Sequence, residues 1–375
     1  MELVVRKNDL LRELQFFQGI VERKNTIPIL ANVLLEAKSD EVRFLATDLE
    51  VALRSKCAAT VVKPGSLTLP AKKLYEIVKS LPETDIRIAQ DKSGVKVAAD
   101  RFDSRMQTLP REDFPTLPET GGASSAVLPR NAVKEMVAKT QFAITGEDTR
   151  YFLNGAQFVL RPDSMSLVAT DGHRLALVTA GRNGKAKTGA SGSAEEENKA
   201  ILPKKTLGEL ARLLGEGEGD VSYERGENHL FFKVGDRLLI SRMIDGQFPA
   251  YERVIPKGND KHIEFERDRL ANAVKRVALL SNERSRAVKF QIEKGKVDVT
   301  SSSPEIGEAT ETLPVDYSGT SLQICFNAQY VLDFLAAVAT DVVSLELKDE
   351  VSQAVMKPVG AEGYEYTYVI MPMRV

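Results

Sequence analysis

Residues that could carry acid–base or nucleophilic chemistry are few in this chain of 375 residues. The three histidines, His173, His229 and His262, belong to no HExxH motif and to no Cys/His cluster of the kind that binds zinc. No G-x-S-x-G sequence is present, and neither Cys57 nor Cys325 has a histidine nearby in sequence. We therefore expect no catalytic centre, no metal site and no cofactor.

The best candidate for chemistry is Thr170–Arg174 (TDGHR), which places an acid beside a possible base. Ala46–Asp48 (ATD) occupies the same place in the first third of the chain and lacks the histidine. A residue type shared by both places is typical of a turn in which Asp accepts hydrogen bonds from backbone amides. Three interpretations stay open for His173: a catalytic base, part of a structural turn, and part of a binding surface.

A second candidate is the segment Arg182–Lys199, which is rich in Gly, Ala, Ser and charge. Gly184 and Gly189 have the spacing of a phosphate-binding loop, but Ala190 stands where that motif needs lysine. The composition favours a mobile hairpin loop over a nucleotide site.

The elements that position these residues form a repeat written three times. Asn8, Asn131 and Asp268 align, and each is predicted to cap a helix. The apolar positions that follow have the spacing of an amphipathic helix with one buried face: Leu10, Leu14, Phe17; Val133, Val137, Thr140; Leu270, Val274, Val277. A second set behaves alike: Leu74, Ile77, Val78, Leu81; Leu207, Leu210, Ala211, Leu214; Val331, Phe334, Leu335, Val338. Repeats of this length are whole domains, because solenoid repeats are far shorter.

Each repeat is predicted to contain two helices, each preceded by a strand and followed by further strands. The expected helices are 9–18, 71–80, 132–141, 204–214, 269–280 and 328–339. Expected strands include Leu3–Arg6, Ile29–Ala37, Val42–Ala46, Val51–Val61, Leu67–Pro70, Leu153–Leu160, Met165–Ala169, Leu175–Thr179, Ala200–Pro203, Ala287–Ile292, Lys296–Thr300 and Gln323–Phe326. Glu119–Ala126 and Val254–Lys261 have the composition of linkers. The predicted domains are 1–120, 127–252 and 253–375.

Composition indicates an ordinary globular protein with a net charge of −2. Two distant cysteines predict no disulfide and a reducing compartment. No apolar run approaches the roughly eighteen residues that span a bilayer. The first residues, MELVVRKNDLL, lack the pattern of a signal peptide. We expect a cytoplasmic protein.

Charge is distributed unevenly between the helices and the rest of the chain. The six predicted helices carry twelve basic and six acidic residues, a net charge of +6, which leaves −8 for the remainder. Lysine is common on solvated helix faces, but five of the six helices carry basic residues. A basic helical layer on an acidic body predicts a surface that faces phosphates and reads no bases.

Several stretches, taken in order, resemble one family: the bacterial beta subunits of DNA polymerase III, or sliding clamps. The resemblance covers the whole chain, and the joint order and spacing of its motifs are specific. They are Thr26–Leu30 (TIPIL), Thr47–Glu50 (TDLE), Arg150–Gly155 (RYFLNG), Ala169–Ala176 (ATDGHRLA), Gly246–Tyr251 (GQFPAY), Leu280–Glu283 (LSNE) and Tyr368–Val375 (YVIMPMRV).

The resemblance implies an α+β fold of three similar domains, the DNA clamp fold. It implies a head-to-tail homodimeric ring with helices lining the pore and antiparallel sheets outside. Twelve helices about 10 Å apart would leave an opening of about 28 Å, which is wide enough for a duplex. Such a ring holds DNA topologically, so it can slide on weak contacts that are independent of sequence. The expected localisation becomes the cytoplasm, in association with the nucleoid.

The resemblance also assigns roles to single residues. Positions that match DNA contacts of the family are Lys24, Lys72, Glu147, Tyr151 and Phe152, although the Glu147 carboxylate would repel phosphate and Phe152 has no hydroxyl. Positions that match subunit contacts are Met106, Leu279 and Leu280. Ser104 and Gly307 stand where the family often has an aromatic residue and an acid.

A pocket for partner peptides is implied between the second and third domains. The matching positions are Leu153, Thr170, His173, Arg174, Leu175, Pro249, Arg253, Val254, Val351, Met371, Pro372, Met373 and Arg374. Aliphatic and Met side chains suit an adaptable apolar groove, with arginines to orient polar groups. Met371 and Met373 could instead be core residues of a last strand. The implied partners are the DNA polymerase III catalytic subunit, the clamp loader, other polymerases and repair proteins, each through a short linear peptide.

Two other classes of protein stay open at this point. An enzyme acting on nucleic acid would need an acidic metal cluster, which the sequence does not reveal. A peptide-binding scaffold that never encircles DNA would keep the pocket and lose the ring.

Overall fold

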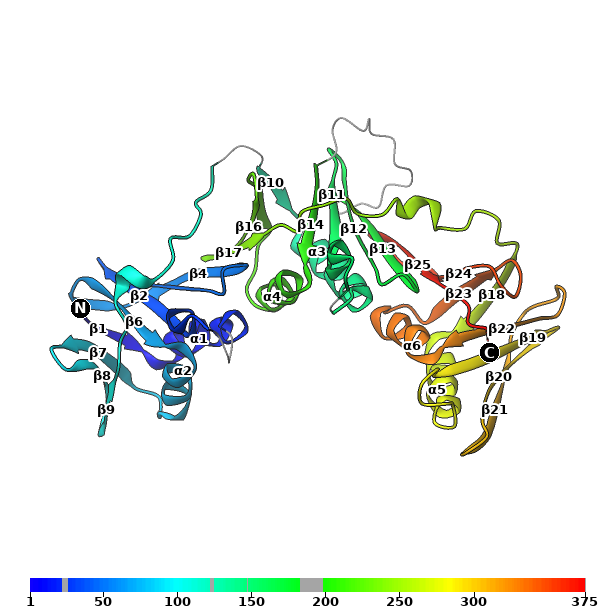
Figure 1. The fold of residues 1–375 in the computed structure, drawn as a ribbon, viewed down its shortest axis with the longest axis horizontal. Helices are drawn as coiled ribbons and strands as arrows, with labels where there is room; N and C mark the ends of the chain where they lie inside the picture. Colours follow the sequence, from blue (N-terminus) through cyan, green and yellow to red (C-terminus); the bar gives the residue numbers. More distant parts are fainter. Residues whose placement is uncertain (22–25, 122–124, 147, 183–197, 375) are drawn as a thin grey trace. The chain divides into compact units, whose positions relative to one another are not determined.

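The computed structural model describes residues 1–21, 26–121, 125–146, 148–182 and 198–374. The chain divides into two compact units. Unit 1 holds Met1–Arg130 with Lys205–Met243, and unit 2 holds Asn131–Lys204 with Ile244–Val375. Both units combine helices with antiparallel sheets (Figure 1). The prediction of an α+β fold is confirmed.

The described part of unit 1 contains three helices and two sheets. Its helices are α1 (Lys7–Ile20), α2 (Ala71–Ser80) and α4 (Lys204–Gly215), with short 3-10 turns η1 (Pro28–Ala31) and η2 (Arg111–Asp113). Its strands are β1 (Glu2–Arg6), β2 (Asn32–Lys38), β3 (Glu41–Thr47), β4 (Val51–Ala58), β5 (Thr60–Lys63), β6 (Gly65–Pro70), β7 (Asp85–Asp91), β8 (Gly94–Ala99), β9 (Phe102–Met106), β10 (Ser125–Leu128), β15 (Val221–Arg225), β16 (His229–Val234) and β17 (Arg237–Arg242).

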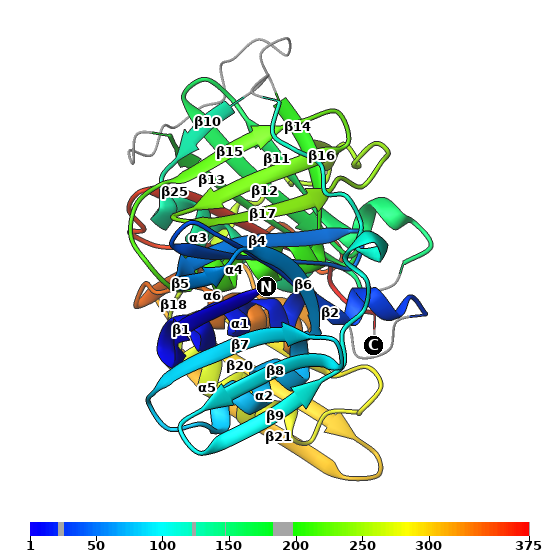
Figure 2. The same ribbon diagram turned by 90° about the vertical axis from the view of Figure 1, so that its left-hand side faces the viewer.

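The larger sheet of unit 1 joins the first repeat to the second. Its order is β10-β15-β16-β17-β4-β3-β2-β6, and the joint is the antiparallel pair β17–β4, with Leu239 opposite Leu53 (Figure 2). The smaller sheet has the order β5-β1-β7-β8-β9. Among the described strands β9 pairs only with β8, so it is an edge.

Unit 2 is built in the same way. Its helices are α3 (Arg130–Thr140), α5 (Arg267–Ala278) and α6 (Ala328–Ala337), with 3-10 turns η3 (Gln141–Ala143), η4 (Tyr151–Asn154) and η6 (Tyr251–Arg253). Its strands are β11 (Gly155–Leu160), β12 (Ser164–Thr170), β13 (Arg174–Gly181), β14 (Asn198–Pro203), β18 (Lys261–Glu266), β19 (Ala287–Glu293), β20 (Lys296–Ser303), β21 (Gly307–Pro314), β22 (Leu322–Asn327), β23 (Val342–Leu347), β24 (Ala354–Pro358) and β25 (Tyr364–Ile370).

The larger sheet of unit 2 joins the second repeat to the third. Its order is β14-β11-β12-β13-β25-β24-β23-β18. The pair β13–β25 runs in register from Arg174 opposite Ile370 to Ala180 opposite Tyr364. The second sheet, β21-β20-β19-β22, ends at β21, which pairs only with β20 among the described strands.

The core confirms the repeated helix pattern. Every residue of the first aligned set, from Leu10 to Val277, is buried. In the second set only Ile77 and Ala211 are half-buried, and the others are buried. Within unit 1, α1 packs on α2 and on β4, and within unit 2, α5 packs on α6 and on β20.

Several boundaries differ from the predictions. Asn8, Asn131 and Asp268 lie inside the first turns of their helices and are not N-caps, because each helix begins two residues earlier than the spacing predicted. Asn327 is an N-cap, since its side chain accepts a hydrogen bond from the Gln329 amide.

Two expected strands and one expected linker also need correction. The start of the predicted strand at Ile29 is the turn η1, where Pro28 occupies the first position. The start of the predicted strand at Leu153 is the turn η4. Ser125 and Ala126, expected in a linker, begin β10 because β15 offers them a pairing edge. The loop expected between Arg182 and Lys199 lies mostly outside the described residues, at 183–197.

Gly155 allows η4 to pass directly into β11. A Cβ atom at this position would lie 2.4 Å from the carbonyl oxygen of Leu202 on β14, a backbone atom that cannot move without disturbing the sheet. Gly208 in α4 offers a contrast, because a Cβ atom there meets nothing within 4 Å.

We predict that Gly155→Ala destabilises the protein by about 1–3 kcal/mol, since the added methyl overpacks a sheet. Gly208→Ala should stabilise α4 by up to about 1 kcal/mol, because alanine has the higher helix propensity. Thermal unfolding followed by circular dichroism measures both. A Gly155→Ala variant as stable as the parent would contradict the close approach.

Candidate functional site

A groove opens in unit 2 where the Thr170–Leu175 turn meets the C-terminal segment. Its cavity has a volume of about 180 Å³ and is lined by Arg150, Leu153, Thr170, Gly172, His173, Arg174, Leu175, Pro249, Tyr251, Val254, Val369 and Met371. We call this cavity the peptide groove. Leu175, Tyr251 and Val369 form the floor of this groove, and they belong to a cluster of buried apolar residues. The surface therefore offers aliphatic and aromatic contact with a polar rim.

The turn that forms one wall is held by its own side chains. The Thr170 hydroxyl donates to the Arg174 carbonyl over 2.7 Å and accepts from the Gly172 amide. Asp171 Oδ1 accepts from the His173 and Arg174 amides, both at 3.0 Å. Gly172 has a φ of +86°, a conformation that glycine adopts without strain.

The same turn recurs in unit 1 with different residues at its tip. Thr47 donates to the Val51 carbonyl, and Asp48 Oδ1 accepts from the Glu50 and Val51 amides. Leu49 stands in the place of Gly172 with a φ of +79°. The shared Thr and Asp are therefore structural, as the sequence comparison suggested. The residues that differ, Gly172, His173 and Arg174, are those that line the peptide groove.

His173 is exposed at the rim of the groove. Both oxygens of its neighbour Asp171 are already engaged, by backbone amides and by the Arg174 guanidinium. No hydrogen bond of the imidazole is found within the described part of the chain. This arrangement fits a binding surface, because nothing here orients His173 as a catalytic base.

The second wall is the C-terminal segment that follows β25. The Met371 amide donates to the His173 carbonyl over 2.9 Å, and the Met373 amide donates to the Cys325 carbonyl over 2.8 Å. The Met371 side chain is 37% exposed, so it is not a core residue of the last strand. The tail is thus fixed on both sides while its Met side chain faces the groove.

The predicted pocket residues divide into two groups. Those that line the cavity are Leu153, Thr170, His173, Arg174, Leu175, Pro249, Val254 and Met371. Arg253, Val351, Pro372, Met373 and Arg374 do not line it, and Val351 is 64% exposed in the loop before β24. Sequence reasoning missed Arg150, Gly172, Tyr251 and Val369, although Arg150 and Tyr251 stand in the RYFLNG and GQFPAY motifs.

Arg150 at the rim is held by Asp148. Its Nε and Nη2 atoms donate to the two carboxylate oxygens at 3.0 and 2.8 Å. These hydrogen bonds, together with one from the Arg150 amide, lower the pKa of Asp148 to about 2. The guanidinium is thereby kept at the edge of the peptide groove.

The predicted DNA contacts are only partly described. Lys24 and Glu147 lie outside the described residues. Lys72 stands in the first turn of α2 and is half-buried. Tyr151 is 55% exposed and meets Phe152 edge-on, with ring centroids 5.9 Å apart. Phe152 packs against the cluster beneath the peptide groove.

The basic helical layer is thinner than the sequence suggested. Lys139 of α3 is 2% exposed, with Glu135 beside its ammonium group and the Tyr364 ring 4.5 Å away. Lys205 and Arg212 of α4 bind Asp48 and Glu209. The inclusion of Lys139 was wrong, because its side chain is buried. Lys73, Lys79, Lys134, Lys204, Arg269 and Lys275 remain exposed.

The predicted subunit contacts lie on the edge strand β9 and just after helix α5. Met106 ends the edge strand β9 but is buried in its own unit, whereas Phe102 on the same strand is 38% exposed. Leu279, just after α5, is 77% exposed, and Leu280 is half-buried. Ile306, in the hairpin that leads to β21, is 51% exposed. Phe102 and Ile306 are surface apolar residues that the sequence analysis did not single out.

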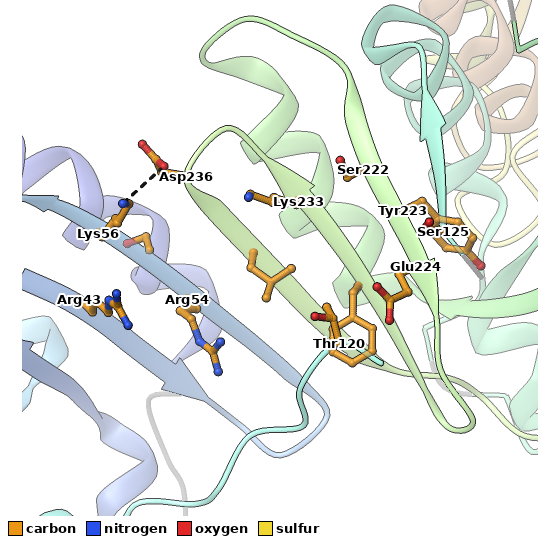
Figure 3. A pocket seen from close by; sticks show the side chains of 13 residues that line it. Arg43, Arg54, Lys56, Thr120, Ser125, Ser222, Tyr223, Glu224, Lys233 and Asp236 are labelled. Carbon is orange, nitrogen blue, oxygen red and sulfur yellow. Dashed lines mark ion pairs between the residues drawn. The ribbon is translucent and has the colours of Figure 1, made fainter. Parts of the chain in front are cut away.

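A wider cavity of about 460 Å³ lies in unit 1, against strands β3, β4 and β15–β17. Figure 3 shows Arg43, Arg54 and Lys56 along one side and Lys233 with Glu224 along the other. Its charges are largely compensated. Arg43 and Lys56 both donate to Glu41, and Arg54 makes two hydrogen bonds with Glu119. We assign no function to this cavity.

Other kinds of site find no support in the described ranges. No cluster of three or more His, Cys, Asp or Glu side chains that could hold a metal ion occurs there. Cys57 and Cys325 are free thiols. None of the described helices is long and apolar enough to cross a membrane.

Comparison with known proteins decides the family. The N-terminal, central and C-terminal domain families of the DNA polymerase III beta subunit match residues 1–118, 127–250 and 252–374. The chain belongs to the DNA polymerase III beta subunit family. The beta sliding clamp of Pseudomonas putida is 38% identical over 378 residues, with both chains covered completely. The Escherichia coli beta sliding clamp is 35% identical over 376 residues, again with full coverage.

Solved structures agree with this assignment. The DNA polymerase III beta subunit of Pseudomonas aeruginosa superimposes with a TM-score of 0.92 at 35% identity, with full coverage of both chains. A Pseudomonas aeruginosa DnaN sliding clamp bound to griselimycin has a TM-score of 0.91 at 36% identity and full coverage. The three-domain DNA clamp fold is therefore confirmed. The beta family consists of sliding clamps, which are processivity factors rather than catalysts.

The Arg150–Asp148 pair gives a pH-dependent prediction. The lowered pKa of Asp148 contributes stability that is fully present above the unfolded value of 3.8 and is lost as the pH falls toward 2. In Arg150→Ala the pKa of Asp148 should rise toward 3.8, because its strongest hydrogen bonds are removed. An NMR titration of carboxyl resonances, assigned with Asp148→Asn, measures the change. An unaltered pKa would show that Arg150 does not hold Asp148.

Proposed function

We propose that two copies of this chain close head to tail into a ring around duplex DNA. The ring tethers the replicative polymerase and other partners for processive synthesis. The observation that carries this proposal is the full-length match of three consecutive beta-subunit domains. A ring holds its DNA topologically, so the sparse cations on the helices suffice for contact with phosphates of any sequence.

The proposed domains are 1–120, 127–252 and 253–375. The three family matches, at 1–118, 127–250 and 252–374, support these bounds. The two compact units of the fold divide the middle domain, because its strands pair with both neighbours through β17–β4 and β13–β25. The domains are repeats in sequence that share their sheets in three dimensions.

The proposed DNA contacts are Lys24, Lys72, Glu147, Tyr151 and Phe152. The exposure of Tyr151 supports its role, since an exposed aromatic hydroxyl can donate to a phosphate. Phe152 would act through packing, because it supports Tyr151 from below.

The proposed partner site is the peptide groove. Its apolar floor and the adaptable Met371 suit a short linear peptide with aliphatic or aromatic side chains. Arg253 and Arg374 are exposed, and each is close in sequence to residues that line the groove. Neither forms an ion pair with an acidic residue of the described ranges, so both can bind acidic groups of a partner peptide. The proposed partners are the DNA polymerase III catalytic subunit, the clamp loader, other polymerases and repair proteins. Griselimycin, which is bound to a related clamp, is a practical ligand for tests.

The proposed subunit interface pairs the β9 edge of one copy with the β21 edge of the other. Apolar side chains beside these edges, Phe102, Leu279 and Ile306, support the proposal, because edge pairing with flanking apolar contacts gives a stable joint. Met106, Leu279 and Leu280 remain the positions expected from the family. We place the protein in the cytoplasm, associated with the nucleoid.

The topological hold is tested with DNA of two shapes. After loading by the clamp loader, the protein should remain on a nicked circular plasmid during gel filtration and be lost when the plasmid is cut. Retention on both forms would indicate ordinary affinity. Loss from both would favour a scaffold that does not encircle DNA.

We predict that Lys72→Glu weakens loading onto the nicked circle by about threefold to tenfold, since one phosphate contact becomes a repulsion. Lys38→Glu, at an exposed end of β2, is the control for a change of charge. Loading that is equal for the two variants would count against a DNA contact at Lys72.

Deletion of residues 371–375 should abolish partner binding and leave the dimer intact. The deletion removes one wall of the peptide groove. The edge strands β9 and β21 of the proposed subunit interface belong to other sheets and are not altered. Calorimetry with griselimycin and mass measurement by light scattering give the two readouts. Loss of the dimer would contradict the assignment of the tail to the partner site.

A further inference from the structure

The wall of the peptide groove is tied to a helix by one buried guanidinium. Arg174 is 9% exposed, although it belongs to a surface turn. Its Nε donates to Asp171 Oδ2 over 3.0 Å, its Nη1 to Asp333 Oδ2 over 2.5 Å, and its Nη2 to the Phe142 carbonyl over 2.7 Å. The planar fork of arginine thus joins the turn, η3 and α6 in a single network.

On the side of the turn, Arg174 orients the groove residues. It shares the Asp171 carboxylate with the amides of His173 and Arg174 itself. The His173 carbonyl in turn accepts from the Met371 amide. A shift of the guanidinium would therefore be passed to both walls of the groove.

On the side of the helix, Asp333 is itself held in place. Its Oδ1 accepts from Gln329 Nε2 over 2.7 Å, one turn earlier in α6. The Tyr330 ring lies 4.3 Å from the Arg174 guanidinium, and Tyr368 donates to the Tyr330 carbonyl. One face of α6 is thus organised around Arg174.

The C-terminal tail is anchored to the same segment. Met373 donates to the Cys325 carbonyl on β22, and β22 continues directly into α6. Both walls of the peptide groove therefore rest on the segment from Cys325 to Asp333.

The related turn in unit 1 shows that this support is a local addition. Val51 occupies the place of Arg174, and the second oxygen of Asp48 binds Lys205 instead. The turn itself closes without an arginine or an acid equivalent to Asp333. The Arg174–Asp333 pair therefore serves something other than the turn's own geometry.

We infer that Asp333 is a positioning residue of the peptide groove, which it never touches: it holds Arg174, and through Arg174 both walls, in the conformation that receives the partner. This inference rests on the proposed partner site. A buried guanidinium that loses one of its two carboxylates is left undercompensated, so it must rotate toward water and take the turn with it.

The test compares Asp333→Ala and Asp333→Asn with a matched control in the full-length protein. Glu346→Gln is the control, since Glu346 accepts two hydrogen bonds from Lys357 and is 17% exposed in its side chain, against 21% for Asp333. Griselimycin affinity, measured by calorimetry, should fall about tenfold in Asp333→Ala, less in Asp333→Asn, and not at all in Glu346→Gln. Parent affinity in both Asp333 variants would overturn the inference.

A double variant separates positioning from general weakening. In an Arg174→Gln background, Asp333→Ala should cause no further loss of affinity, because its effect passes through the guanidinium. An additional loss of the same size in that background would contradict the inference. Light scattering and thermal unfolding establish that each variant is a folded dimer.

Hydrogen exchange distinguishes a failure of this inference from a failure of the proposed site. The amides of residues 170–175 and of Met371, Met373 and Arg374 should exchange faster in both Asp333 variants than in the parent and in Glu346→Gln, whether or not griselimycin binds. A parent protein that binds no griselimycin would overturn the partner site alone. Unchanged exchange in the Asp333 variants would overturn the positioning role.

Discussion

Backbone hydrogen bonding between strands of neighbouring repeats holds this chain together. β17 pairs with β4 in unit 1, and β13 pairs with β25 in unit 2. Each eight-stranded sheet therefore contains strands from two neighbouring repeats. Because antiparallel pairing fixes register, each joint also fixes which side chains of the two repeats face one another. The peptide groove results from the second of these strand pairs. The turn before β13 and the tail after β25 meet at the end of the sheet where Arg174 pairs with Ile370.

The two copies of the Thr-Asp turn show how one local structure acquires a binding role. In both, a threonine hydroxyl and an aspartate carboxylate satisfy the backbone of the turn. In unit 1 the tip carries Leu49 at a positive φ and buried Val51. In unit 2 the tip carries Gly172, His173 and Arg174. Glycine removes a side chain from the groove, and arginine adds a buried ionic support beneath it.

The sequence predicted much of this fold, because its signals were local and repeated. Helical spacing placed the buried face of all six helices, and 71–80 has the observed bounds. The predicted N-caps failed because these helices begin two residues earlier than the spacing indicated, so Asn8 falls within the first turn. The pairing of β4 with β17 was not predicted, since it joins residues far apart in the chain and leaves no local pattern.

The site was predicted in part for similar reasons. Resemblance to the family gave the groove residues on the TDGHR turn and the tail. Tyr251 and Val369 were found only in the structure, where they line the groove and pack in the buried cluster beneath it. Lys139 was counted as a surface cation because composition cannot show where a side chain points. Asp333 was seen only as one acid in a helix, and its bond to Arg174 spans 159 positions of sequence.

The strands β9 and β21, each of which pairs on one side only among the described strands, have a consequence for the chain before it assembles. A free sheet edge can pair with the strands of other chains and so lead to aggregation, and charged side chains on the edge disfavour such pairing. Here Asp103 and Arg105 place charges on β9, and exposed Glu308 stands on β21. Like charges would repel if two β21 edges met, which disfavours symmetric mispairing. Before a second subunit binds, the charges on these two edges therefore protect the newly made chain from mispairing.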